Sequence, residues 1–198
     1  MHRKTYLLLF LSLVMVAALL SGCAGMQAKP SEANFQAPVV SLEEMEVAHA
    51  FGYWYFSKGV KPTKGNPDNV GAPLDLAFTF NVENPNKFPV LLEDLKFSVA
   101  FEDFVLNTVG TTAAQWIPPG MTNQVKVHAH FDVRQSLLSL LVTGGFKLKD
   151  KGTNAWAQLE AWWTGIPKYE VPVSVQDGAA VFRAGGLTKV QVFTGQFP

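Results

Sequence analysis

Hydrophobic and polar positions alternate with a period of two over much of the chain beyond residue 40, which is the pattern of a β-strand with one face buried. The alternation is cleanest at 74–82, 95–101 and 125–133. Weaker strands are predicted at 42–49, 53–60, 104–110, 156–164, 169–176 and 188–193. One buried and one solvated face per strand is typical of antiparallel sheets, because parallel sheets are usually covered on both faces.

Turn-forming residues separate these runs, and only the segment 134–142 favours a helix. Its leucines fall on one stripe, and Asp132 is placed to cap its first turn. The predicted turns are Asn84-Pro85-Asn86, Pro118-Pro119-Gly120, Gly144-Gly145 and Asp177-Gly178. The pattern as a whole predicts an all-β, antiparallel, two-layer β-sandwich with one short helix.

The first 22 residues are predicted to be a signal peptide. A short basic head precedes an apolar run from Tyr6 to Leu20, which is too short to cross a bilayer easily and suits a secretory leader. Leu20-Ser21-Gly22-Cys23 then resembles the lipobox of bacterial lipoproteins. The alternative is an uncleaved anchor helix with an incidental cysteine.

The lipobox resemblance implies a diacylglyceryl group on Cys23, cleavage before it and acylation (palmitate-type) of the new N-terminus. Two or three acyl chains hold a protein stably on a membrane. Ala24 in the next position points to the periplasmic side of the outer membrane, by similarity to enterobacterial sorting. We expect residues 23–40 to be a lipidated, flexible tether and 41–198 to be the folded domain.

Composition narrows the possible partners. The chain has 198 residues, of which 48% are hydrophobic and 16% charged, and this suits one folded domain with a leader. Lys plus Arg and Asp plus Glu each number 16, so there is no basic excess to neutralise phosphates and we expect no nucleic-acid partner. The single cysteine excludes an internal disulfide.

The stretch 78–90 carries a family resemblance. An alternating strand ends there in Asn84-Pro85-Asn86, and a hydrophobic hairpin (91–109), a Pro119-Gly120 turn, a valine-rich strand (125–133) and the short helix follow. This order resembles the late-embryogenesis-abundant type 2 family, also called the water-stress and hypersensitive-response (WHy) domain. The resemblance implies an immunoglobulin- or fibronectin-III-like β-sandwich. Pro85 ends strand pairing and Asn side chains bond nearby backbone, so the motif itself is interpreted as a structural turn.

Candidate chemistry is sparse. His128 and His130 are two apart on one strand and share its solvated face with Asp132, which makes them weak metal candidates, but solvated surface residues are the favoured interpretation. The sequence has no Gly-x-Ser-x-Gly, phosphate loop or dinucleotide fingerprint. We therefore expect a non-enzyme without a cofactor or metal.

Two aromatic clusters remain, at Tyr53-Trp54-Tyr55 and Trp162-Trp163. Neighbours on a strand face opposite sides, so each cluster either packs under another element or forms an exposed patch for a protein, lipid or polymer partner. Two functions follow as hypotheses. The first is a membrane-anchored protective or structural protein in desiccation or envelope stress. The alternative is a lipid- or protein-binding module in envelope lipid traffic.

Overall fold

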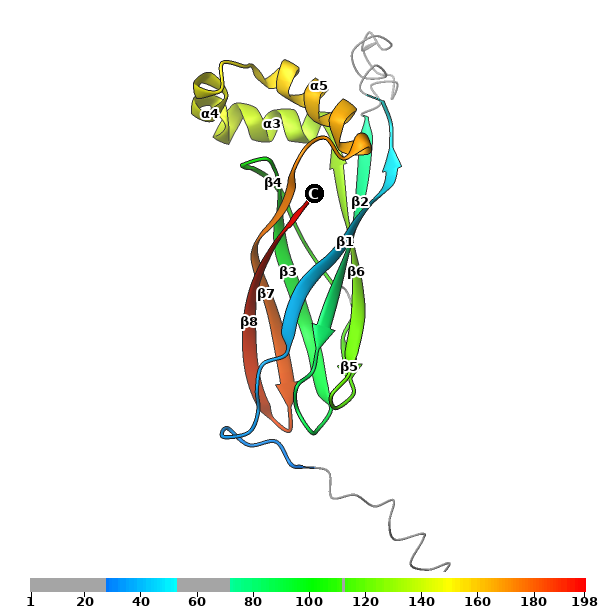
Figure 1. Cartoon of the computed structure of the whole chain (residues 1–198). Helices are drawn as coiled ribbons and strands as arrows, with labels where there is room; N and C mark the ends of the chain where they lie inside the picture. The colour runs from blue at the N-terminus through cyan, green and yellow to red at the C-terminus, as the bar shows by residue number, and fades with distance from the viewer. Residues whose placement is uncertain (1–27, 53–71, 112) are drawn as a thin grey trace, which may run out of the picture.

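The computed structural model describes residues 28–52, 72–111 and 113–198, and these form an antiparallel β-sandwich with helices at one end (Figure 1). The strands are β1 (Val39–Ala50), β2 (Pro73–Glu83), β3 (Val90–Phe101), β4 (Phe104–Gly110), β5 (Gln115–Ile117), β6 (Thr122–Asp132), β7 (Val173–Ala184) and β8 (Leu187–Phe197). The predicted strand at 53–60 lies outside the described residues, as do the leader and Cys23.

The strands form two sheets. One has the order β1-β2-β6; the other has the order β4-β3-β7-β8, with β5 also pairing β3, and every pairing is antiparallel. This confirms the predicted all-β sandwich. Two packed antiparallel sheets are the architecture that immunoglobulin and fibronectin-III domains share.

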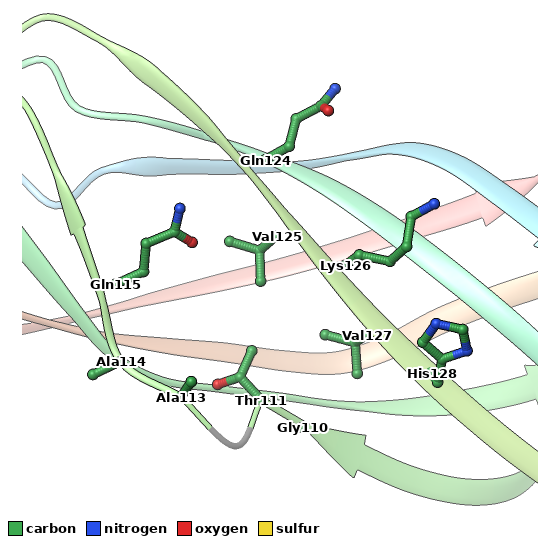
Figure 2. Close-up of a pocket in the computed structure, with 10 residues that line it drawn as sticks. All are labelled: Gly110, Thr111, Ala113, Ala114, Gln115, Gln124, Val125, Lys126, Val127 and His128. Carbon is green, nitrogen blue, oxygen red and sulfur yellow. The ribbon is translucent and has the colours of Figure 1, made fainter.

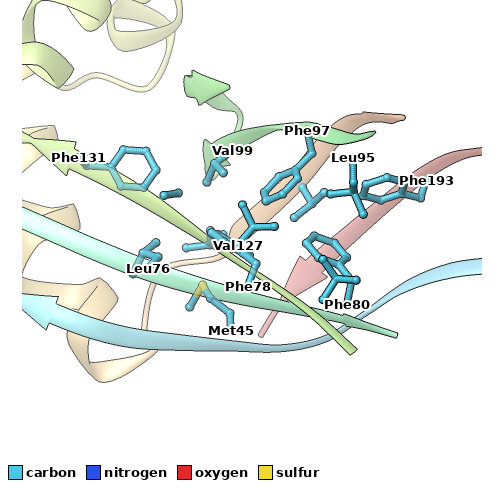
Figure 3. Packing of buried hydrophobic residues seen from close by; sticks show 14 of the residues in the cluster. Met45, Leu76, Phe78, Phe80, Leu95, Phe97, Val99, Val127, Phe131 and Phe193 are labelled. Atoms are coloured by element: carbon cyan, nitrogen blue, oxygen red, sulfur yellow. The ribbon is translucent and has the colours of Figure 1, made fainter. Parts of the chain in front are cut away.

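The core lies between the two sheets and is built from the inward positions of the alternating strands (Figure 3). Phe97 packs edge-on against Phe78 and Phe80, with ring centroids 5.4 and 5.0 Å apart. Phe193 of β8 lies 5.3 Å from Phe80. Edge-to-face packing of this kind is favourable beyond simple burial, and these rings occupy the space between the sheets.

The helical content is larger than predicted. The helices are α3 (Val133–Thr143), α4 (Gly145–Asp150), α5 (Ala155–Gly165) and the 3₁₀ turn η1 (Ile166–Lys168). They gather at one end of the sandwich (Figure 1), and we call them the cap. As predicted, Asp132 caps α3, its carboxylate accepting a hydrogen bond from the backbone N–H of Arg134.

The prediction of a strand at 156–164 was wrong, because this segment is α5. The side chain of Asn154 accepts hydrogen bonds from two backbone N–H groups of the first turn, which is a strong helix start. Leu159, Trp162, Trp163 and Ile166 then recur at helical spacing and are all buried. Ala, Gln, Leu and Glu between them favour a helix, so the signal was present and the aromatic residues obscured it.

Asp177-Gly178 was predicted to be a turn and is instead a bulge inside β7. Asp177 has a φ of 50°, and the register with β8 shifts between Val175 and Gly178. A Cβ at Gly178 would lie 2.5 Å from the carbonyl oxygen of Phe193, so only glycine fits there. The turn between β7 and β8 is made by Gly185 and Gly186, both with positive φ.

The folded domain begins earlier than residue 41. Phe35 is buried in the core, where it packs against Phe88 with ring centroids 6.0 Å apart. The backbone N–H and carbonyl of Gln36 both bond the side chain of Asn86, at 2.8 Å each. The predicted tether of 23–40 was therefore too long, because part of it packs on the sandwich.

Within the described residues, the structure contains no helix with the length and apolarity to span a bilayer.

Candidate binding groove at the edge of strand β6

One side of the sandwich is closed and the other is open. On the closed side β1 approaches β8 so tightly that a Cβ at Gly195 would lie 2.8 Å from the Cβ of Leu42. On the open side β6 is the edge strand of its sheet, and no described strand pairs with its outer edge. The chain between β4 and β5 runs past this edge at a distance and leaves a groove (Figure 2).

The groove has a volume of about 550 Å³ and is lined by residues 110–111, 113–115 and 124–128. Val125 and Val127 are buried and form its apolar floor. Figure 2 shows these two side chains pointing toward the β4–β5 segment, whereas Gln124 and Lys126 point to the other side of the strand. Ala113 and Ala114 form an exposed, small-residue wall opposite.

Two side chains bridge the sheets near the ends of the groove. The amide Nδ2 of Asn107 donates to the carbonyl oxygen of His130 at 3.0 Å, and Nδ2 of Asn123 donates to that of Trp116 at 3.1 Å. Between these two bonds, no described strand pairs with the outer edge of β6. Within the described residues, the central part of β6 is therefore an open edge whose backbone groups face the groove.

The outer face of β6 is polar and weakly charged. Lys126 donates a hydrogen bond to Oε2 of Glu46 at 2.7 Å, and this bond raises the pKa of the Lys126 ammonium above its ordinary value. His128 Nδ1 lies 3.3 Å from Oδ1 of Asp75. The groove is thus apolar at its floor and polar along the outer side of the strand.

The structure places the two predicted metal candidates, His128 and His130, on the same exposed face. The strand register brings Asp75 and His49 to the same region, because Asp75 lies opposite His130 on one side and His49 on the other. The sequence alone could not place these two residues. Even so, the described residues contain no group of three or more His, Cys, Asp or Glu side chains arranged to hold a metal ion.

Asn84 and Asn86 form a hydrogen-bond network at the end of the sandwich opposite the cap. The buried Nδ2 of Asn84 lies 3.0–3.1 Å from the carbonyl oxygens of Phe88, Ile117 and Pro118. Its Oδ1 accepts from both the backbone and the side-chain amide of Asn86, at 3.0 and 2.9 Å. The motif joins β2, the β3 entry, the β5 exit and the N-terminal segment.

Two residues of the predicted aromatic patch, Trp162 and Trp163, are in the core, 0% and 2% exposed. For these two, packing under another element is correct and the exposed patch is not. Trp163 Nε1 donates to the carbonyl oxygen of Ala72 at 2.7 Å. Tyr53, Trp54 and Tyr55 lie outside the described residues. Exposed large apolar side chains occur on several elements, and four of them, Leu138, Leu141, Val142 and Phe146, lie on α3 and α4. A helix was predicted over most of α3, whereas α4 was not predicted.

Comparisons with known proteins do not name a family. No family model matches the chain, and no curated protein matches it. Among solved structures, a protein from Archaeoglobus fulgidus is similar with a TM-score of 0.40 and 14% identity over 79% of this chain and 94% of that one. A target of the Northeast Structural Genomics Consortium, solved by X-ray crystallography, is similar with a TM-score of 0.40 and 10% identity over 82% of this chain and 88% of that one.

Proposed function

We propose that the protein is a membrane-anchored envelope lipoprotein whose LEA type 2/WHy-like domain acts without catalysis and protects neighbouring proteins during desiccation or envelope stress. The groove along β6 is the observation that carries this proposal. Stress exposes extended, partly apolar segments of other proteins. An open strand edge beside an apolar floor is suited to bind such segments.

The groove supplies both parts of strand recognition. Unpaired backbone groups on an edge strand bond an added strand, and pockets along it accept alternate side chains. Val125 and Val127 are two residues apart, so they present apolar surface at the repeat distance of an extended chain. We therefore infer binding with little sequence preference beyond apolar side chains at every second position.

The alternative function, a lipid-handling module in envelope lipid traffic, has different support. The space between the sheets is filled by aromatic side chains, which argues against an acyl chain there. A separate crevice of about 330 Å³ lies between β4 and α3, lined in part by Phe104, Leu106 and Leu140. Native mass spectrometry of the purified protein tests this alternative, since a bound lipid would favour it.

The groove can be blocked without altering the core. Ala114→Trp places a bulky ring on an exposed wall, and we expect it to weaken suppression of client aggregation after drying by about tenfold or more, because the edge is no longer accessible. Thr188→Trp adds the same ring to an exposed position of β8 and serves as the matched control. Light scattering of a dried and rehydrated model enzyme measures both. Equal protection by the two variants would rule out the groove.

The anchor makes a separate prediction. Intact-mass spectrometry of the protein extracted from bacterial membranes should show loss of residues 1–22 and the added mass of a diacylglyceryl group and an acyl chain on Cys23. A Cys23→Ala variant should lack both changes. An uncleaved chain or an unmodified cysteine in the wild-type protein would favour the simple anchor-helix alternative.

A further inference from the structure

Helix α3 is apolar on two opposite faces. Its inner face carries Val133 and Leu140, which are buried against the sandwich and the other helices. Its outer face carries Leu138, Leu141 and Val142, which are 64%, 60% and 81% exposed. Their spacing places all three on one stripe of the helix. Surface helices normally carry polar residues there, and in the described part of the chain this face is left largely exposed.

A further exposed apolar side chain follows at the start of α4. Phe146, the second residue of α4, is 88% exposed. We call Leu138, Leu141, Val142 and Phe146 the cap patch. Four large apolar side chains are thus exposed within nine residues of two consecutive helices. Large exposed apolar patches commonly mark interaction sites.

Basic residues accompany the patch. Residues 133–168 contain five Lys or Arg and two Asp or Glu. Lys151 is paired with Glu102 and Asp103, and Lys147 lies 3.8 Å from Asp103. Lys149, next along α4, is exposed and forms no salt bridge within the described part of the chain. With Glu102 and Asp103 included, the cap keeps a small positive excess.

We propose that the cap patch docks on the surface of a phospholipid bilayer, with its four apolar side chains at the boundary between headgroups and acyl chains. Leu, Phe and Val beside lysines are the composition of interfacial helices that lie in this boundary. The positive excess complements anionic headgroups. Trp156 of α5, 52% exposed, adds a ring of the kind found in interfacial belts. The crevice between β4 and α3, bordered by the same helix, offers room beside the patch.

The cap lies at the end of the sandwich opposite the entry of the N-terminal segment (Figure 1). Only residues 24–27 separate Cys23 from Ala28, and five residue steps reach at most about 18 Å. The cap contact is therefore physically separate from the proposed lipid anchor. The inference does not rest on the groove at β6, but its test in vesicles uses the lipid anchor of the proposed function, which the intact mass of the protein checks separately.

The test uses the full lipoprotein in vesicles of phosphatidylethanolamine and phosphatidylglycerol. Because the chain has one cysteine, predicted to be acylated, a Phe146→Cys variant can be labelled with an environment-sensitive fluorophore. We expect a blue shift at low protein density, either in isolated vesicles or when acceptor vesicles are added. The same label at Val192→Cys on β8, 73% exposed, should not shift and is the matched control.

A second measurement uses unlabelled protein. Leu141→Ser combined with Phe146→Ser should reduce binding to acceptor vesicles about tenfold or more, because two large side chains no longer leave water. Val190→Ser with Val192→Ser should leave binding unchanged. Thermal unfolding should be similar for all variants, since these side chains are exposed. Absence of a shift at Phe146→Cys would overturn the proposal, as would a shift that depends on protein density alone, which would indicate contact between copies.

Discussion

Replacing Asn84 with Ala should lower the free energy of unfolding by about 3–5 kcal/mol, because several buried backbone groups lose their partner at once. The Asn84 side chain is fully buried, and its Nδ2 lies within hydrogen-bonding distance of three carbonyl oxygens. Its Oδ1 also accepts from Asn86, which in turn bonds both backbone groups of Gln36. Loss of Asn84 should therefore loosen the N-terminal segment as well as the turn.

Urea denaturation followed by circular dichroism measures this effect. Asn123→Ala is the matched control, because Asn123 is partly exposed and donates one bond, to Trp116. We expect it to cost about 0.5–1 kcal/mol. Similar losses for the two variants would show that the Asn84 network contributes far less than its hydrogen bonds suggest.

Trp163→Phe should destabilise the protein more than Trp162→Phe, although both rings are buried on the same helix. The Trp163 indole donates to the carbonyl oxygen of Ala72, which is itself fully buried. Its loss leaves that oxygen unpaired and creates a small cavity, for a total of about 2–4 kcal/mol. Trp162 Nε1 is buried without a hydrogen-bond partner among the described residues, so Trp162→Phe pays mainly for the cavity, about 1–2 kcal/mol.

The comparison is internally controlled, since the substitution and the helix are the same. Urea unfolding of both variants, monitored by the fluorescence of the remaining tryptophans, gives the difference directly. Equal destabilisation would show that the bond to Ala72 contributes nothing net, and a reversed order would mean that Trp162 has a partner outside the described residues.

The strands were predictable because their signal is local. At 74–82, 95–101 and 125–133 each inward residue is apolar and most outward ones are polar, and these runs became β2, β3 and β6. The segment 104–110 matches β4. Such alternation places the apolar residues on one face only if the segment is a strand. The secondary structure is therefore set by the segment itself and does not depend on its neighbours.

α5 and the N-terminal segment were not predicted, for different reasons. In α5 the spacing of the apolar residues fits a helix, but the adjacent tryptophans and alanines fitted a strand equally well. The cap that Asn154 forms on the first turn decides for the helix. Phe35 stands alone in a polar, proline-containing stretch. Its burial depends on Phe88 and Asn86, about fifty residues away, which no local pattern records.

The groove and the cap patch depend wholly on the tertiary structure. The groove exists because β6 is the last strand of its sheet and the β4–β5 segment passes it without pairing. Nothing in the residues of β6 distinguishes an edge strand from a central one. The cap patch exists because α3 lies at the end of the sandwich, where the described elements bury only one of its apolar faces.

The amino-acid sequence alone determined the all-β class, most strand positions and the turn at Asn84-Pro85-Asn86. These depend on the order of neighbouring residues, which constrains the backbone within a few positions. Only the tertiary structure decided which strand edges stay open, which tryptophans are buried and which helix face is uncovered. Those properties depend on contacts between segments far apart in the chain. The sequence does not specify these contacts locally, because the hydrophobic effect is non-directional and any apolar partner that excludes water can bury a given side chain.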